Sequence, residues 1–286
     1  MQTSTSIRET RVVSQAARAE GRTVGVVPTM GALHAGHVSL MEISRERCDF
    51  VIATIFVNPT QFGPNEDLDK YPRTLEADLE KCEAAGVDLV FHPNIDDMYP
   101  KGADTFVEVD RLSRLHEGEH RSGHFRGVTT IVLKLFNITE PDVAFFGQKD
   151  YQQQLLIKQM CVDLDVPVEV CTCPIVREPD GLALSSRNRY LSDSERTTAL
   201  RLSQCLRLGQ ERIETGATDV AAVVAAMADH LAGDDVVIDY VKVVDANTLA
   251  ELSVPTTNMV ALVAARVGST RLIDNMLLAA SATRTH

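Results

Sequence analysis

One stretch, residues 24–41, constrains what this chain can fold into more than any other. An apolar run leads into a tight turn that contains Pro28 and Gly31, and the residues after the turn have the pattern of a helix. His34 and His37 stand three residues apart where that helix begins, so their side chains share one face of its first turn. A strand, a turn and a helix in this order are typical of an open α/β sheet, whose ligands bind at such turns.

The chemistry of this turn suits a phosphate group. A helix N-terminus carries free backbone N–H groups and the positive end of the helix dipole, and both attract anions. Imidazoles can donate hydrogen bonds to phosphoryl oxygens as charge builds on them. Gly31 and Gly36 leave room for a nucleotide to approach the backbone. The alternative is an ordinary buried strand, turn and helix in which His34 and His37 are incidental, but their place at the first strand-to-helix turn favours phosphate binding.

The size and charge of the chain exclude several classes of protein. Its 286 residues are enough for two domains or one large domain, and 44% hydrophobic with 24% charged residues is ordinary for a soluble globular protein. The net charge of −12 argues against nonspecific nucleic-acid binding, which needs a basic surface. Residues 1–20 carry charges throughout, and no apolar run is long enough to span a membrane. We therefore expect a cytoplasmic enzyme or binding protein with no nucleic-acid partner and no membrane partner.

The six cysteines do not suggest a metal site or a redox motif. None lies in a C-x-x-C pair, and a zinc site would need further ligands nearby. Cys171 and Cys173 lie two apart in a predicted strand and should face the same side of it. Buried thiols in a reducing compartment are the better interpretation. The other cysteines are Cys48, Cys82, Cys161 and Cys205.

Strands and helices alternate over the first part of the chain, which predicts an α/β fold of parallel β-α-β units. Several strands are continuously apolar, as expected when both faces of a parallel sheet are covered. After the first strand, further strands are expected at residues 50–57, 88–92, 105–109, 143–146 and 168–173. Helices are expected at residues 6–20, 73–85, 127–138 and 151–164. Two prolines and a glycine exclude regular structure at residues 58–64, where polar Asn58 and Gln61 should lie over the carboxyl edge of the sheet.

A loop rich in turn-forming and polar residues, 174–189, marks a boundary between two domains, residues 1–175 and residues 176–286. The second domain should contain both helices and strands. Its helices are expected at residues 192–213 and 219–231, and its strands at residues 236–244 and 259–265, with residues 271–275 as a candidate third strand.

Three polar segments lie next to strands of the predicted sheet. They contain His34 and His37; Lys149 and Asp150; and Ser185, Ser186 and Arg187. The hydroxyls and the guanidinium of the third segment suit phosphate, although serines that cap a helix beside a solvated arginine would explain it on their own. A metal site among the charged residues 116–121 is conceivable, but mixed charges in a loop are usually solvated surface.

The motifs that are missing narrow the function. The chain has no G-x-x-x-x-G-K-[ST] sequence and no G-x-G-x-x-G sequence, which argues against a P-loop NTPase and a dinucleotide enzyme. Two histidines at a helix start, together with lysine, arginine and serines, suit attack at an α-phosphate with pyrophosphate as the leaving group. In such phosphoryl chemistry the protein mainly positions the reactants and stabilises charge.

Taken together, six motifs make the chain resemble the pantoate–β-alanine ligase family, within the HIGH-motif nucleotidylyltransferase superfamily. Several motifs in the family's order and spacing are far more specific than any one alone. The resemblance covers at least residues 23–191. The motifs are PTMGALHAGH at 28–37, FVNPTQF at 56–62, YPRT at 71–74, HFRGV at 124–128, FFGQKDYQQ at 145–153 and LSSRN at 184–188.

The resemblance implies an ATP-dependent ligase that works in two steps. The pantoate carboxylate attacks the α-phosphate of ATP and gives pantoyl adenylate and pyrophosphate. The β-alanine amine then attacks the acyl carbon and gives pantothenate and AMP. Mg²⁺ is expected to bridge phosphate oxygens with few protein ligands. The implied architecture is a Rossmann-like parallel-sheet domain that binds ATP and pantoate, residues 1–175, a smaller α/β lid domain, residues 176–286, and a homodimer formed through the first domain.

The resemblance also assigns the nucleotide side of the site. His34 and His37 should stabilise the phosphates in the transition state, with His37 as the usual donor. Lys149 should neutralise developing charge, and Asp150 should contact the nucleotide or Mg²⁺. Further residues expected on this side are Met30, Gly31, Gly147, Val176 and Leu184, with Ser185, Ser186 and Arg187 on the phosphates.

Gln61 and Gln153 match the family residues that hold pantoate, and Met30 should pack near this substrate. Two positions depart from the family, which commonly has Glu in place of Gln148 and Met in place of Leu184. Two other hypotheses stay open: a nucleotidyltransferase that stops at a nucleotide-capped product, and an inactive nucleotide-binding module. The loss of a charge beside Lys149 is the only support for the inactive module.

Overall fold

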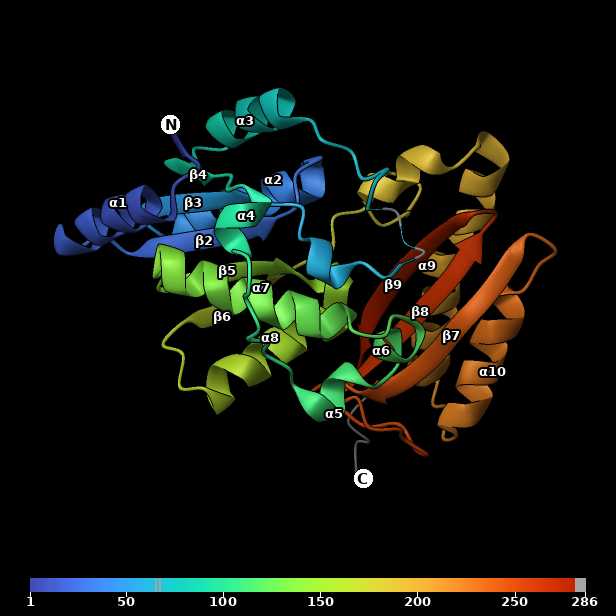
Figure 1. Ribbon diagram of the computed structural model, residues 1–286. Coiled ribbons are helices and arrows are strands. Elements are labelled where there is room, and N and C mark those ends of the chain that lie inside the picture. Colours follow the sequence, from blue (N-terminus) through green and yellow to red (C-terminus); the bar gives the residue numbers. More distant parts are fainter. Residues whose placement is uncertain (65, 67, 281–286) are drawn as a thin grey trace. The chain divides into compact units, whose positions relative to one another are not determined.

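The computed structural model describes residues 1–64, 66 and 68–280, and it divides into two compact units (Figure 1). The first unit is Met1–Ile175 and the second begins at Val176. No helix in the described part of the chain is both long and apolar enough to cross a membrane.

A six-stranded parallel sheet forms the centre of the first unit, which confirms the expected Rossmann-like architecture. The strand order is β1-β4-β3-β2-β5-β6, so β3 and β4 follow β2 on one side, β5 and β6 follow on the other, and the first strand, β1, lies at the edge beside β4. The order therefore reverses between β2 and β5, and the crevice at the carboxyl ends of these two strands is where ligands bind in open α/β sheets. The strands are β1 (Gln2–Ser4), β2 (Val24–Thr29), β3 (Phe50–Ile55), β4 (Leu89–Phe91), β5 (Val143–Gly147) and β6 (Glu169–Cys173).

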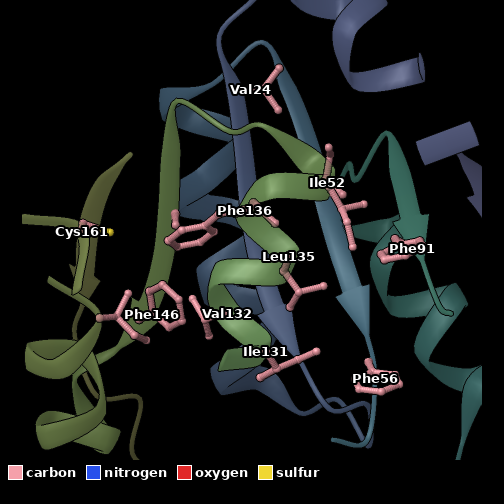
Figure 2. Packing of buried hydrophobic residues seen from close by; sticks show 14 of the residues in the cluster. Val24, Ile52, Phe56, Phe91, Ile131, Val132, Leu135, Phe136, Phe146 and Cys161 are labelled. Atoms are coloured by element: carbon pink, nitrogen blue, oxygen red, sulfur yellow. The ribbon is translucent and has the colours of Figure 1, made fainter. Parts of the chain in front are cut away.

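Helices cover both faces of this sheet, which is why inner strands such as β3 and β5 are buried and mostly apolar. One face packs on α1 (Ile7–Ala19), α7 (His124–Thr139) and α8 (Tyr151–Asp163). Figure 2 shows this cluster, in which Phe136 of α7 lies against Phe146 of β5 with ring centroids 6.5 Å apart. The opposite face packs on α2 (Ala35–Arg47) and α3 (Leu75–Ala84).

The segment between β4 and α7 differs from expectation. No strand forms at residues 105–109, because the backbone of Val107 bonds to threonine hydroxyls of α7 instead of a neighbouring strand. Its N–H donates to Thr130 Oγ1 (2.9 Å) and its carbonyl accepts from Thr129 Oγ1 (2.6 Å). The segment instead contains three one-turn helices, α4 (Ile95–Met98), α5 (Asp110–Ser113) and α6 (Glu117–His120).

The loop after β3 was also expected to lack regular structure, and this was wrong over three residues. Pro59–Gln61 forms a short 3₁₀ helix, η1, in which proline occupies the first position. Asn58 precedes it and its side chain accepts from the Thr60 N–H. Proline is tolerated there because the first N–H groups of a helix have no partner within it.

The second unit is a three-stranded antiparallel sheet with two helices packed on one face. The third strand, β9, is longer than the candidate strand expected, because its residues pair with β8 along the full length of both strands. A short 3₁₀ helix, η3 (Ser186–Tyr190), precedes the first long helix. The elements are α9 (Asp193–Glu214), α10 (Val220–Leu231), β7 (Val236–Asp245), β8 (Met259–Val267) and β9 (Thr270–Leu278).

Candidate active site

The two polar segments of the first unit lie at its topological switch point. The turn after β2 leads into α2 and carries His34 and His37, and the turn after β5 leads into α8 and carries Lys149 and Asp150. Strands β2 and β5 are hydrogen-bonded neighbours, with Val26 opposite Ala144. The structure therefore brings together two segments that lie more than a hundred residues apart in the sequence.

The histidine pair caps helix α2. His34 is the N-cap residue, and its Nδ1 accepts from the Gly36 N–H at 3.1 Å. His37 reaches back, and its Nδ1 accepts from the His34 N–H at 3.3 Å. The two rings lie with their centroids 4.1 Å apart. Reciprocal bonds of this kind form a capping box, here made by two imidazoles instead of the usual serine and glutamate.

This geometry changes which groups can bind an anion. The sequence suggested free backbone N–H groups at the start of α2, but most of them have acceptors within the protein. Gly31 N–H donates to Thr29 Oγ1, and the Ala32 and Leu33 N–H groups donate to the Asp78 carboxylate. The backbone of the following turn is satisfied by the histidines themselves. Because both Nδ1 atoms accept, neither carries a hydrogen, so the ring hydrogen of each imidazole lies on Nε2 and the imidazoles carry the donors of this site.

His37 is held in its neutral form. Burial, followed by electrostatic interaction with His34, Lys149 and Lys81, lowers the pKa of His37 to about 3. Its Nε2 has no hydrogen-bond partner among the described residues, since the bond that its side chain makes there uses Nδ1. A neutral imidazole with a fixed Nε2–H is a directed hydrogen-bond donor that requires no protonation at neutral pH.

The turn after β5 supplies the charged groups. Gly147 ends β5, and a single 3₁₀ turn, η2 (Gln148–Asp150), leads into α8. The Lys149 ammonium is close enough to lower the pKa of His37. Asp150 is exposed, and its side chain forms no hydrogen bond within the described residues. The Lys149 ammonium thus lies near His37, and a free carboxylate follows it in the chain.

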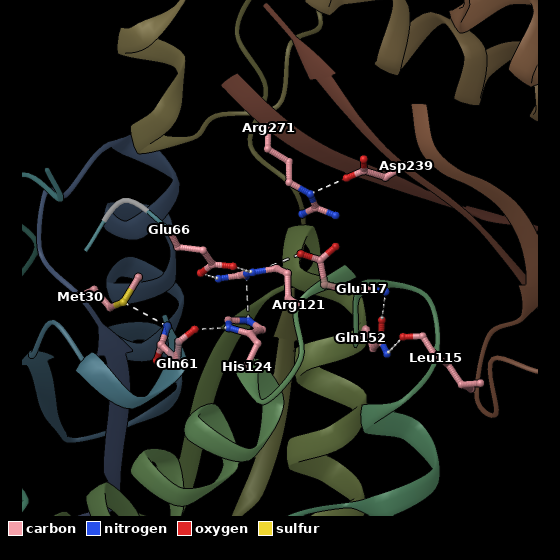
Figure 3. Close-up of polar contacts among 10 residues, drawn as sticks. All are labelled: Met30, Gln61, Glu66, Leu115, Glu117, Arg121, His124, Gln152, Asp239 and Arg271. Carbon is pink, nitrogen blue, oxygen red and sulfur yellow. Dashed lines mark hydrogen bonds and ion pairs between the residues drawn. The ribbon is translucent and has the colours of Figure 1, made fainter. Parts of the chain in front are cut away.

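Met30, in the turn after β2, and Gln61 of η1 lie in contact (Figure 3). Gln61 is buried, and its Nε2 lies 3.2 Å from Met30 Sδ. Its Oε1 accepts from Asn58 Nδ2 at 3.0 Å, and Asn58 in turn accepts from the Tyr99 hydroxyl at 2.8 Å. The amide of Gln61 is therefore fixed by its neighbours, with one N–H left to donate to a ligand.

A second layer of contacts holds the backbone of Gln61. The backbone carbonyl of Gln61 accepts from His124 Nδ1 at 2.8 Å, which places the ring proton of His124 on Nδ1. The other ring nitrogen, Nε2, therefore accepts from Arg121 Nη1 at 3.0 Å. Arg121 also forms a bidentate ion pair with Glu66, with both N–O distances 2.7 Å. Burial, and then the Arg121 charge, lowers the pKa of His124 to about 4, so this ring is neutral as well. The sequence did not reveal that His124, Arg121 and Glu66 support Gln61, although His124 lies in the HFRGV motif.

Gln153 and its neighbour Gln152 have different surroundings. Gln153, expected at the pantoate site, is partly buried on α8 and forms no side-chain hydrogen bond with the described residues. Gln152 is buried and binds the backbone of α5, α6 and the turn between them. Its Nε2 lies 2.7 Å from the Leu112 carbonyl. Its Nε2 also lies 2.7 Å from the Leu115 carbonyl, and its Oε1 accepts from the Glu117 N–H (Figure 3). Gln153 is therefore the member of the pair that keeps hydrogen-bonding groups for a ligand.

The remaining predicted residues belong to the second unit. The Leu184 N–H donates to the Val176 carbonyl at 3.0 Å, which closes a hairpin between them. Arg177 within this hairpin forms a bidentate ion pair with buried Asp274 of β9, with N–O distances of 2.6 and 2.9 Å.

Ser185 caps η3 by accepting from the Arg187 N–H at 3.3 Å, and Ser186 is the first residue of η3. The capping interpretation of this segment is therefore correct for Ser185. The cap sets the backbone direction of the residues that follow it.

The cysteines and acidic residues form no metal centre in the described ranges. No group of three or more His, Cys, Asp or Glu residues there could hold a metal ion, which leaves the site considered at residues 116–121 without support. All six cysteines are free thiols; Cys171 is partly buried and the other five are buried. Arg47 donates to Cys171 Sγ at 3.0 Å.

The fold and this edge of the sheet define a Rossmann-like α/β enzyme whose site is arranged for an anionic substrate. The family model described as Pantoate-beta-alanine ligase matches residues 2–277. The chain belongs to the pantoate–β-alanine ligase family, which confirms the resemblance found in its motifs.

Sequence relatives and solved structures agree with this assignment. The chain is 50% identical to a pantothenate synthetase of Acetivibrio thermocellus, over 96% of this chain and 98% of the relative, and 53% identical to that of Moorella thermoacetica, over 92% and 93%. The pantothenate synthetase structure from Thermus thermophilus superposes with a TM-score of 0.91 at 44% identity, over 96% of this chain and 99% of that one. The pantoate–β-alanine ligase of Francisella tularensis, complexed with beta-gamma ATP and beta-alanine, gives 0.80 at 33%, over 97% of each chain.

Proposed function

We propose that this ligase joins pantoate to β-alanine through a pantoyl adenylate. The pantoate carboxylate attacks the α-phosphate of ATP and expels pyrophosphate, and the β-alanine amine then displaces AMP from the acyl carbon. Adenylation converts a poor leaving group into a good one, and the site must keep water from the mixed anhydride. The Francisella relative, which was solved with an ATP compound and β-alanine, supports both co-substrates.

The fixed Nε2–H of His37 is the observation that carries this proposal. Negative charge builds on the phosphate oxygens as the carboxylate attacks, and a donor oriented in advance stabilises that charge without reorganisation. The capping bond holds the ring in the tautomer that donates, and the lowered pKa keeps it neutral. His34, whose Nδ1 is also used in the cap, acts beside it on the same phosphates.

Charged side chains complete the phosphate site in this proposal. Lys149 neutralises developing charge from the turn after β5. Ser185, Ser186 and Arg187 reach the phosphates from the second unit, which acts as a lid. Gly31, Gly147, Val176 and Leu184 contact the nucleotide through their backbone, so the departure at Leu184 should leave its contact in place. Met30 lies between the nucleotide and pantoate.

Gln61 and Gln153 hold pantoate by amide hydrogen bonds to its hydroxyls and carboxylate. The residue environment fits this role, because Gln61 is fixed through its carbonyl oxygens while one N–H stays available, and Gln153 has no internal partner among the described residues.

The residues present also fit Mg²⁺. This ion keeps several waters and uses one or two carboxylates with substrate phosphates, so a protein cage is not needed. Asp150, an exposed carboxylate with no hydrogen-bond partner in the described chain, would hold the ion next to the phosphates. When bound, Mg²⁺ neutralises phosphate charge.

We also propose that the enzyme is a cytoplasmic homodimer formed through its first unit. Sedimentation equilibrium would measure the mass of the assembly and so test whether it is a dimer.

An assay with each acid omitted in turn tests the proposed reaction. Purified protein with ATP, Mg²⁺, pantoate and β-alanine should release equal amounts of AMP and pyrophosphate, with no multiple turnover when either acid is missing. Release of ADP, or activity without pantoate, would contradict the proposal. Continuous pyrophosphate release without β-alanine would identify the nucleotidyltransferase instead, and ATP binding without turnover would identify the inactive module.

A further inference from the structure

A buried carboxylate on α3 holds the turn in front of the histidine pair. Asp78 has no exposed surface. Its Oδ2 accepts from the Ala32 N–H at 2.9 Å, its Oδ1 accepts from the Leu33 N–H at 2.8 Å, and the Thr74 hydroxyl donates to Oδ2 at 3.2 Å. A charged group buried in this way is stable only when its oxygens are satisfied, and here backbone donors from a segment over forty residues away satisfy them.

The turn needs such an anchor. Gly31 and Ala32 both adopt positive φ, at 80° and 51°. For alanine this left-handed conformation costs about 1–2 kcal/mol, so it persists only where surrounding contacts determine it. Successive N–H groups in such a turn point to one side and form a concavity for an anion. The protein fills this concavity with its own carboxylate.

The turn that Asp78 holds determines how the His34 and His37 imidazoles are placed. Leu33 precedes His34, so the direction of the Leu33 peptide sets where the N-cap residue begins. His34 N–H is in turn the donor that fixes the His37 ring. The chain of contacts therefore runs from Asp78 through the turn to the Nε2–H of His37. The same helix carries Lys81, one of the charges that act on His37.

We infer that Asp78 is a positioning residue for adenylation: by fixing the turn at residues 31–33, it sets the tautomer and the direction of the His34 and His37 donors. This inference rests on the proposed function. It differs from a purely structural role because it predicts a change in imidazole state and in one chemical step, and not only a loss of stability.

The substitution Asp78→Asn tests the inference in the full-length enzyme. Asparagine keeps the shape but offers one acceptor oxygen and turns an amide donor toward the second N–H of the turn. Single-turnover pyrophosphate release from ATP and pantoate should fall by about 10- to 100-fold, the range expected when a donor is displaced but not removed. The second step, measured by adding β-alanine to supplied pantoyl adenylate, should change by less than about threefold.

A spectroscopic readout does not depend on activity. In ¹⁵N-labelled protein at pH 7, His37 should be in the Nε2–H form in the wild type and should populate both tautomers in Asp78→Asn. Adding Ala32→Gly to this variant should restore part of the rate and of the tautomer ratio, because glycine adopts positive φ without strain.

Asp245→Asn is the matched control. The Asp245 Oδ1 also accepts from two backbone N–H groups, those of Asn247 at 3.0 Å and Thr248 at 2.8 Å, and from the Thr248 hydroxyl, but it does so at the end of β7 in the second unit. This variant should keep the wild-type rate of pyrophosphate release and the His37 tautomer.

Three results would overturn the inference: wild-type rate and tautomer in folded Asp78→Asn, an equal loss in Asp245→Asn, or an equal loss in both chemical steps. If Asp78→Asn does not fold, Thr74→Val can be used instead, because it removes one donor to the Asp78 carboxylate. This variant should slow pyrophosphate release by a few-fold and change the His37 tautomer in the same way. No change in the rate and none in the tautomer would also overturn the inference. A wild-type enzyme without pantoate-dependent pyrophosphate release would instead contradict the proposed function, and the tautomer measurement would still decide the role of Asp78.

Discussion

Two backbone N–H groups decide which nitrogen of each imidazole carries the proton. Since Gly36 and His34 donate to the Nδ1 atoms of His34 and His37, both rings keep their proton on Nε2. In the proposed function the helix terminus therefore acts on the phosphates through two side chains and not through bare peptide groups. The sequence indicates a phosphate site at this helix start, but it does not reveal that the histidines themselves occupy the capping positions.

Substitutions at His37 should separate capping from catalysis. His37→Ala removes both functions, so adenylation should slow by about 10²–10³-fold, as for loss of one charge-stabilising donor, and stability should fall by about 0.5–2 kcal/mol. Glutamine, like glutamate, is a usual partner in a capping box, so His37→Gln should retain most of the stability while remaining slow. Rapid-quench pyrophosphate release and thermal unfolding measure the two effects. Equal destabilisation by both variants would show that glutamine does not restore the cap.

At the scale of elements, periodicity predicts long helices and strands well and long-range side-chain contacts poorly. The α2 helix and the β2 strand follow from local apolar patterns. The three-residue β1 strand has too few residues to show a pattern, and one-turn helices such as α5 depend on contacts with Gln152. The sequence indicates the role of Asp78 only indirectly. Asp78 shares a helix face with buried Cys82, and a buried helix face is an unusual place for a carboxylate.

The packing of η1 on α7 should respond to a single methyl group. A Cβ on Gly127 would lie 2.4 Å from the Thr60 carbonyl oxygen and 2.7 Å from Gln61 Cα, and neither backbone atom can move without shifting η1. Gly127→Ala should therefore displace Gln61, raise the KM for pantoate at least about tenfold and cost about 1–3 kcal/mol of stability.

Gly209→Ala in α9 is the matched control for this change. The added Cβ there meets Met227 Sδ, the flexible part of a methionine side chain, which can move aside. Its KM for pantoate should match that of the wild type in steady-state assays. A normal KM in folded Gly127→Ala would mean that Gln61 does not bind pantoate.

At the scale of the whole molecule, the two units should differ in their response to acid. The first unit contains two histidines held neutral, with pKa values of about 3 for His37 and about 4 for His124 against an ordinary value of 6.5. The described histidine of the second unit, His230, is exposed. In that unit, hydrogen bonds to Asp180 and Asp245 lower the pKa of each carboxyl group below its ordinary value of 3.8. These hydrogen bonds therefore stabilise the second unit until the pH falls below that value.

The sign of the effect follows from proton uptake. Below pH 6.5 the unfolded chain binds protons at His37 and His124 that the folded chain does not bind, so stability is complete above this pH and is lost as the pH falls toward 4. At about pH 5 each histidine should cost the first unit on the order of 1–2 kcal/mol. Hydrogen exchange read by mass spectrometry at about pH 7 and about pH 5, corrected for intrinsic rates, should show loss of protection in β2, β5 and α7 but not in β8 or α9. His37→Gln removes one titrating group and should halve the difference, whereas an equal loss in both units would mean that carboxylates, and not these two buried rings, control the acid response.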